Sequence, residues 1–262
     1  MVAAQPPSRD ADYFSGWTAE VGVMHQVWRR FGLLVVGLSV AVALPSATGQ
    51  AEALSPAAAI ARLKSGNAAF VAAPESPLPI SVAGRAALAA GQSPFATVLS
   101  CADSRVPPEI IFHAGLGDLF VVRSAGHVAD RAVLASLEYG AEHLHVPLLV
   151  VMGHESCGAV KAAADTPASQ SMGPNLDYLL RSIRPALTAT GAGADAAALR
   201  AAILRNVEDT VNALMDGSAI LRHLADSGSM GLVGAYYELS SGRVYFSEPV
   251  SVAVQARAGA TH

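Results

Sequence analysis

Cysteine, aromatic residues and charge are all scarce in this chain. Among its 262 residues there are only 2 cysteines, aromatic side chains make up 6% and charged side chains 15%. Two cysteines are too few for a disulfide-rich scaffold, although they can form one bridge or supply two metal ligands. Neither sign of charge dominates, since the formal net charge is −4 and the isoelectric point is about 6.0. Without a basic surface, we expect no nucleic-acid partner.

Hydrophobic residues, by contrast, make up 52% of the chain, so the sequence can bury a substantial core. One uninterrupted apolar run, residues 31–44, directly follows Arg29 and Arg30 and precedes small residues. A run of about fourteen residues is short for a membrane-spanning helix, and this arrangement is typical of a signal peptide. A buried core helix and a membrane anchor are the alternative interpretations.

The chain is therefore expected to divide into three parts. Residues 1–51 are an N-terminal tail and signal peptide, with Met24 as the true start, residues 52–250 are the folded domain, and residues 251–262 are a C-terminal tail. This division predicts an exported, periplasmic protein that has no membrane association once the signal is cleaved. The paired arginines leave both the general secretory and the twin-arginine route open.

Helices and short apolar strands alternate along the expected domain. Ser55 and Pro56 suit the start of a helix, whose apolar spacing is interrupted at Ser65-Gly66-Asn67. Further helices are expected at 83–90, 129–144 and 207–224, and strands at 95–99, 119–123 and 147–152, with a terminal strand pair at 230–236 and 242–246. Continuous apolar strands between helices are typical of a parallel sheet that is covered on both faces. The prediction is a single α/β domain.

Both cysteines lie where an expected strand ends. One segment carries Cys101, Asp103 and Arg105, and the other carries His154 and Cys157. Ligands of open parallel sheets bind beyond the carboxyl ends of the strands, so this placement suits a site. Two thiolates and an imidazole suit Zn²⁺ and leave a fourth position for water, as a catalytic site requires. Asp103 can fill that position, or it can pair with Arg105 and leave the position open.

Two other interpretations of the thiols stay open at this point. An oxidising compartment would allow a disulfide between Cys101 and Cys157, which would leave Asp103, Arg105 and His154 without a role. Alternatively, the two cysteines are unrelated small hydrophobic residues of the core. His154 alone would indicate no more than a loop histidine, so the zinc prediction depends on the combination.

These residues carry a resemblance to a known family. From about Ala57 to Phe246 the chain resembles the β-carbonic anhydrases, with several segments in the family's order and at similar spacing. They are C-x-D-S-R at 101–105, GDLFVVR at 117–123, SLEY at 136–139, G-H-x-x-C-G at 153–158, R-L-K-x-G-N at 62–67, and the late Asn206-Val207, Gly228 and Gly234-Ala-Tyr236. One departure is visible: where many relatives have Arg-Asn-Ala-Gly-Asn, this chain has Arg123-Ser-Ala-Gly-His127.

The resemblance implies a twisted, mostly parallel sheet flanked by helices. It also implies a homodimer or a dimer of dimers, in which the N-terminal helix embraces the neighbouring subunit. By the same resemblance Cys101, His154 and Cys157 are zinc ligands, Asp103 is an exchangeable fourth ligand, and Asp103 and Arg105 form a gating pair.

The implied activity is the zinc-dependent, reversible hydration of carbon dioxide to bicarbonate and a proton, by attack of zinc-bound hydroxide. The Gly158 amide is expected to hydrogen-bond the bicarbonate. Candidates for a proton shuttle are His113, His127, His143 and His145. Two other functions stay open: hydrolysis of a related heteroallene such as carbon disulfide, and non-catalytic binding of zinc or bicarbonate, which the presence of Arg105 disfavours.

Overall fold

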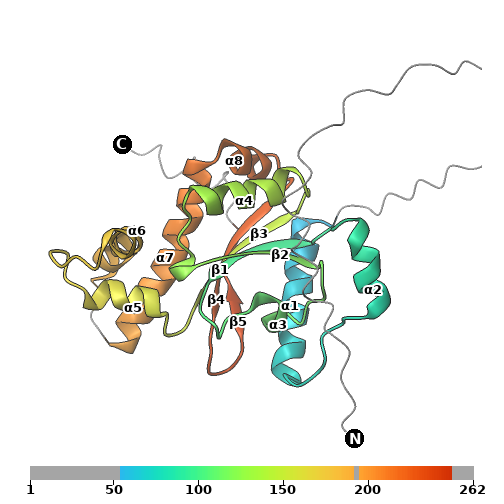
Figure 1. The fold of residues 1–262 in the computed structure, drawn as a ribbon, viewed down its shortest axis with the longest axis horizontal. Coiled ribbons are helices and arrows are strands. Elements are labelled where there is room, and N and C mark those ends of the chain that lie inside the picture. Colours follow the sequence, from blue (N-terminus) through green and yellow to red (C-terminus); the bar gives the residue numbers. More distant parts are fainter. Residues whose placement is uncertain (1–53, 192–194, 250–262) are drawn as a thin grey trace, which may run out of the picture. The chain divides into compact units, whose positions relative to one another are not determined.

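One five-stranded sheet organises the residues that this computed structural model describes, 54–191 and 195–249 (Figure 1). Its strands are β1 (Ala96–Cys101), β2 (Leu119–Ser124), β3 (Leu148–His154), β4 (Gly231–Tyr237) and β5 (Val244–Phe246). The spatial order is β2-β1-β3-β4-β5, and only the β4–β5 pair is antiparallel. The predicted mostly parallel α/β fold is confirmed. The predicted signal peptide lies outside the described residues.

Helices pack on both faces of this sheet. They are α1 (Pro56–Ala72), α2 (Val82–Ala87), α3 (Pro108–Ile111), α4 (Arg131–Glu142), α5 (Gly158–Asp165), α6 (Pro174–Thr190), α7 (Ala196–Gly217) and α8 (Ala219–Asp226), with short 3₁₀ turns η2 (Leu88–Ala90) and η3 (Ala125–His127). Successive β1 residues belong to different buried clusters. Val98 packs with residues of α1 and α6, and Leu99 packs with residues of α4, α7 and α8. None of the helices in the described ranges combines the length and apolarity that crossing a membrane requires.

Although the apolar spacing is interrupted at Ser65-Gly66-Asn67, α1 continues through these residues. Gly66 lies where the backbone after α3 passes, and a Cβ at this position would be only 1.9 Å from the Phe112 carbonyl oxygen. The buried Asn67 side chain donates to the carbonyl oxygens of Ile111 (3.1 Å) and Gly242 (2.8 Å) and accepts from the Val244 amide (2.9 Å). These residues are therefore the point at which α1 docks on α3 and the β4–β5 hairpin.

The helix expected at 207–224 is also corrected. It begins earlier, at Ala196, and the chain leaves the helix at Ser218 before α8 starts. The Ser218 hydroxyl accepts from the Leu221 amide (3.1 Å) and donates to Glu138 of α4 (2.6 Å). A helix cap that also bonds a neighbouring helix therefore separates α7 from α8. The helices α5 and α6 were not predicted.

Candidate metal site

Three of the predicted site residues meet where two neighbouring parallel strands end. Cys101 is the last residue of β1, His154 is the last residue of β3, and Cys157 is the N-cap of α5. One ligand atom from each lies within 4.8 Å of the others, and all three residues are buried. The strands extend two residues further than expected, so Cys101 and His154 belong to the rigid sheet. The expectation that the strand ends bring these residues together is confirmed.

His154 is oriented as a metal ligand would be. Its Nδ1 lies 2.9 Å from the Glu155 carbonyl oxygen, which can only accept, so Nδ1 carries the proton and Nε2 presents a lone pair. Nε2 is buried and has no hydrogen-bond partner within residues 54–191 and 195–249. A buried polar atom without a partner is costly. A metal ion bound at Nε2 removes this cost, and a second ring nitrogen bonded to a carbonyl is the usual support of a histidine ligand.

Cys101 and Cys157 are both free thiols, not a disulfide. The Cys157 thiol donates to Cys101, and this hydrogen bond is the largest of the contributions that lower the pKa of Cys101. The same contact raises the pKa of Cys157, because its proton is held between the two sulfurs. The Gly126 amide donates to the Cys101 sulfur at 3.3 Å and further favours the thiolate. These contacts favour the thiolate form of Cys101, which is the form that binds metals.

Asp103 and Arg105 form a two-pronged ion pair beside this cluster. Arg105 Nε donates to Asp103 Oδ1 (2.9 Å), Nη2 donates to Oδ2 (2.8 Å), and the Arg105 amide donates to Oδ1 (3.0 Å). The guanidinium holds the pKa of the Asp103 carboxyl below its usual range. Oδ2 lies 3.9 Å from His154 Nε2. The carboxylate is thus next to the ligand cluster, while both of its oxygens are bound to Arg105.

The sequence alone gave Arg123 no role of its own. The structure places its side chain against the backbone of the site. Its Nε donates to the Cys101 carbonyl oxygen (3.0 Å) and its Nη2 donates to the Asp103 carbonyl oxygen (2.5 Å). The signal in the sequence was a charged residue that ends an otherwise apolar strand. Asn206 is a second residue whose contact near the site the sequence did not predict: it donates to the carbonyl oxygen of Gly126, in the turn beside Cys101.

Gly158 and the four histidines named as candidate proton shuttles differ in their position and burial. Gly158 opens α5 directly after Cys157, and an added Cβ would meet nothing within 4 Å, so space does not require glycine here. Among the shuttle candidates, His127 is fully buried. His143 and His145 precede β3 and so lie at the opposite end of that strand from His154. His127 therefore has no direct access to solvent, while His113 is half-buried.

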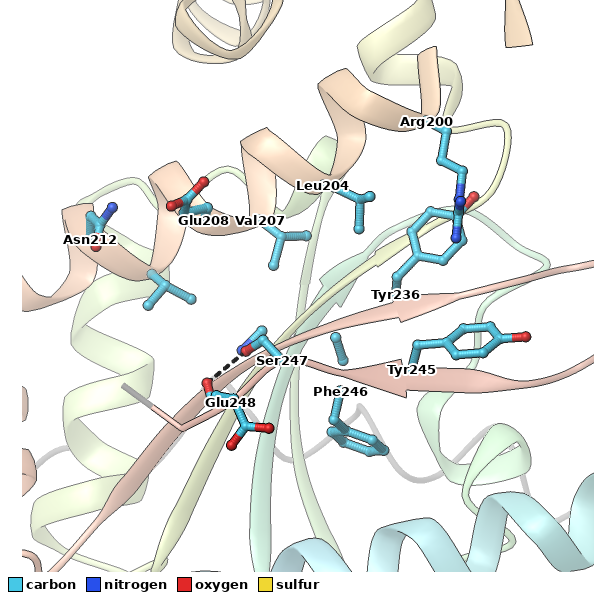
Figure 2. A pocket seen from close by; sticks show the side chains of 13 residues that line it. Arg200, Leu204, Val207, Glu208, Asn212, Tyr236, Tyr245, Phe246, Ser247 and Glu248 are labelled. Carbon is cyan, nitrogen blue, oxygen red and sulfur yellow. Dashed lines mark hydrogen bonds between the residues drawn. The ribbon is translucent and has the colours of Figure 1, made fainter. Parts of the chain in front are cut away.

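A groove of about 560 Å³ lies elsewhere, between α7 and the β4–β5 hairpin (Figure 2). Arg200 of α7 stands over the ring of Tyr236, with 5.2 Å between the guanidinium carbon and the ring centroid. Val207, Tyr245 and Phe246 supply apolar surface. None of the lining residues is Cys101, His154 or Cys157, so the groove is separate from the cluster.

Fold and site together define a class of protein: an α/β domain with a buried Cys₂His metal site at the carboxyl ends of parallel strands. The family model described as carbonic anhydrase matches residues 96–244. Carbonic anhydrase 2 of Mycobacterium tuberculosis is 43% identical over 198 residues, which cover 75% of this chain and 95% of that protein. The carbonic anhydrase of Mycolicibacterium smegmatis is 43% identical over 194 residues, which cover 72% of this chain and 92% of that protein.

Solved structures agree with the sequence comparison. The Coccomyxa β-carbonic anhydrase in complex with acetazolamide has a TM-score of 0.60 at 26% identity, covering 78% of this chain and 91% of that chain. A tetrameric β-carbonic anhydrase from Sordaria macrospora has a TM-score of 0.57 at 26% identity, covering 72% of this chain and 96% of that chain. The chain belongs to the carbonic anhydrase family, β class. It is an enzyme that interconverts carbon dioxide and bicarbonate, as the resemblance predicted.

Proposed function

We propose that this carbonic anhydrase works with Zn²⁺ held by Cys101, His154 and Cys157. The observation that carries the proposal is the buried Nε2 of His154, which has no hydrogen-bond partner in the described part of the chain and lies within 4.8 Å of two thiol sulfurs. Two sulfurs and one imidazole nitrogen match the preference of zinc, and three protein ligands leave one position for water or substrate. When bound, the ion supplies a Lewis acid that makes water a strong nucleophile near neutral pH.

Asp103 and Arg105 decide whether that fourth position is free. Arg105 binds both carboxylate oxygens, and its Nη2 also donates to the Ser156 carbonyl oxygen at 3.3 Å, beside the loop of Cys157. While this pair is intact, Asp103 is kept from the metal. Without Arg105 the carboxylate, 3.9 Å from His154 Nε2, becomes free to serve as the fourth ligand and exclude water.

Gly158 is the proposed partner of bicarbonate. As the first residue of α5, its amide is among the first-turn groups that have no acceptor within the helix. Because it directly follows Cys157, its N–H would lie beside a metal held by that residue and would be available to donate to an anion. The open space around Gly158 leaves room for that anion.

The gate is tested with Arg105→Ala. The variant removes no ligand, so it is expected to keep about one zinc per chain, yet its hydration rate should fall by a factor on the order of a hundred, because each ~1.36 kcal/mol of bias toward closure costs tenfold. Stopped-flow hydration of carbon dioxide and zinc quantification on the same samples give both quantities. Asp103→Ala is the control: it leaves the position open and should also keep zinc. Normal rates in zinc-loaded Arg105→Ala would exclude the gate.

We also propose that the enzyme is exported to the periplasm. The support is the apolar run at 31–44 after Arg29 and Arg30, followed by small residues, which lies outside the described residues. Protein recovered from its host is expected to begin between Ala47 and Glu52, as read by N-terminal sequencing. Soluble cytoplasmic protein that retains residues 24–45 would contradict export.

For assembly, we propose a homodimer or a dimer of dimers. The Sordaria relative is described as tetrameric, and the described part of this chain leaves large hydrophobic side chains such as Tyr139, Leu176 and Leu204 exposed. Light scattering coupled to size exclusion is expected to give two or four times the chain mass of the processed protein. A monomer across micromolar concentrations would rule the proposal out.

A further inference from the structure

Asn206 on α7 contacts the turn beside the metal site although it lies 80 residues away in sequence from Gly126. Its buried Nδ2 lies 3.0 Å from the Gly126 carbonyl oxygen and 3.0 Å from His127 Nε2. An amide NH₂ has two protons, so it can donate to both. His127 Nε2 then accepts, which requires a neutral ring, and burial favours that form by lowering the pKa of His127 to about 4.

The helix that carries Asn206 is fixed tightly against the sheet. A Cβ on Gly153, the residue before His154, would be 2.7 Å from Val207 Cγ2 and 3.0 Å from Ile203 Cγ2. The two side chains that flank Asn206 along α7 therefore pack on the strand that supplies a metal ligand. Because this contact has no room to adjust, Asn206 is held at a defined distance from η3.

The turn itself needs such support. Gly126 and His127 have φ values of 61° and 49°, both in the left-handed region, which is unfavourable for a side-chain-bearing residue such as His127. This conformation aims the Gly126 amide at the Cys101 sulfur, 3.3 Å away. Asn206 bonds the same two residues, one through its backbone and one through its ring. Its two bonds thus favour the conformation that makes the contact to sulfur.

We propose that Asn206 is a positioning residue for the metal centre: it holds the η3 turn so that the Gly126 N–H donates to the Cys101 thiolate. The inference rests on the proposed function, in which Cys101 binds the metal. A hydrogen bond to a ligand sulfur draws electron density from it and fixes its direction, and outer partners of this kind typically change metal affinity by about 10–100-fold. In the described part of the chain the hydrogen bonds of Asn206 go to the turn and not to Cys101, His154 or Cys157, so it would act through the turn.

The native protein provides the first test. With ¹¹³Cd in place of zinc and ¹⁵N labelling, the Gly126 amide proton is expected to show a scalar coupling to the metal through the sulfur. Coupling from cadmium to the Cys101 β-protons, but not to the Gly126 amide, would overturn this inference and leave the metal site intact. No coupling to Cys101 at all would overturn the proposed function itself.

Asn206→Ala is the second test. The amide coupling is expected to disappear and zinc affinity, measured by competition with a chromophoric chelator, to fall by about 10–100-fold. A variant that retains both the coupling and wild-type affinity would overturn the role of Asn206. If it does not fold, Asn206→Ser gives the same comparison, since its shorter side chain cannot reach both acceptors.

Asn212→Ala is the matched control. Asn212 is exposed on the same helix and lines the groove shown in Figure 2. The same asparagine-to-alanine change there has the same effect on helix propensity. It is expected to leave the amide coupling and the zinc affinity at their wild-type values. An equal fall in affinity in both variants would show that the effect comes from α7 as a whole, which would also overturn the proposal.

Discussion

At the scale of single residues, His127 stands where the resemblance led us to expect asparagine. The structure gives a reason for both residues, because the position has a φ of 49°. Asparagine, aspartate and histidine are the side-chain-bearing residues most often found in that region. His127 is buried, and its ring accepts from Asn206 where a shorter side chain would not reach as far. The departure therefore fills the space between η3 and α7 and leaves the three ligands untouched.

Burial of His127 makes stability depend on pH. Its folded-state pKa of about 4 is below the ordinary value of 6.5, so the unfolded chain binds the proton more readily. Between about pH 6.5 and 4 the free energy of unfolding should therefore fall as pH falls, by roughly 3 kcal/mol in total, with no further loss from this group at lower pH. Denaturant unfolding of metal-free protein at several pH values measures this.

The pH dependence of the unfolding free energy should be compared with that of a His127→Asn variant. Asparagine does not titrate and tolerates the left-handed backbone, so this variant should lack the part of the pH dependence that His127 contributes. The unfolding free energy of the wild type minus that of the variant should become lower by roughly 3 kcal/mol as pH falls from 6.5 to 4. Curves that run parallel across that range would show that His127 is not the group responsible.

At the scale of secondary structure, the strands were predictable because each is a continuous apolar run next to a turn. β1 and β3 are buried along their whole length, so each is a continuous apolar run that can be recognised without knowing which strand pairs with it. The site residues followed from the same pattern, since both cysteines come where an apolar run ends. Cys101, His154 and Cys157 were found in this way, together with the neighbouring pair Asp103 and Arg105.

What the sequence did not show depends on contacts between distant elements. The start of α7 at Ala196 is rich in alanine, which favours helix but carries little periodicity. Its end at Ser218 is fixed partly by Glu138 of another helix. Gly66 and Asn67 look like a break until Phe112 and the β4–β5 hairpin are placed beside them. The roles of Arg123 and Asn206 could not be predicted for the same reason.

At the scale of the whole domain, the proposed metal ligands come from two parts of the chain, the end of β1 and the segment from the end of β3 to the start of α5. Cys101 belongs to β1, His154 to β3 and Cys157 to the start of α5, while Arg123 of β2 binds the backbone of the same cluster. The hydrogen bond with Cys101 raises the pKa of Cys157, and within residues 54–191 and 195–249 the buried His154 Nε2 has no hydrogen-bond partner. An ion held by these three residues would satisfy that nitrogen, so metal binding should contribute to the stability of the domain.

Removal of the metal is thus expected to destabilise the wild-type domain. A ligand present at about 1,000 times its dissociation constant stabilises the folded state by ~4 kcal/mol, and for a domain of this size that corresponds to a shift in unfolding temperature on the order of 10 °C. Thermal unfolding should be compared at one protein concentration, with excess zinc and after dialysis against dipicolinate, because assembly also depends on concentration. Zinc added back should restore the higher temperature.

Cys157→Ser supplies the control: it exchanges a thiolate for a poor zinc ligand, so it should unfold near the temperature of the metal-free wild type, and chelation should change it little. If wild-type protein unfolded at the same temperature with and without metal while zinc was shown to be bound, the ion would be a catalytic group only, and the three ligands would be held in place by the sheet alone.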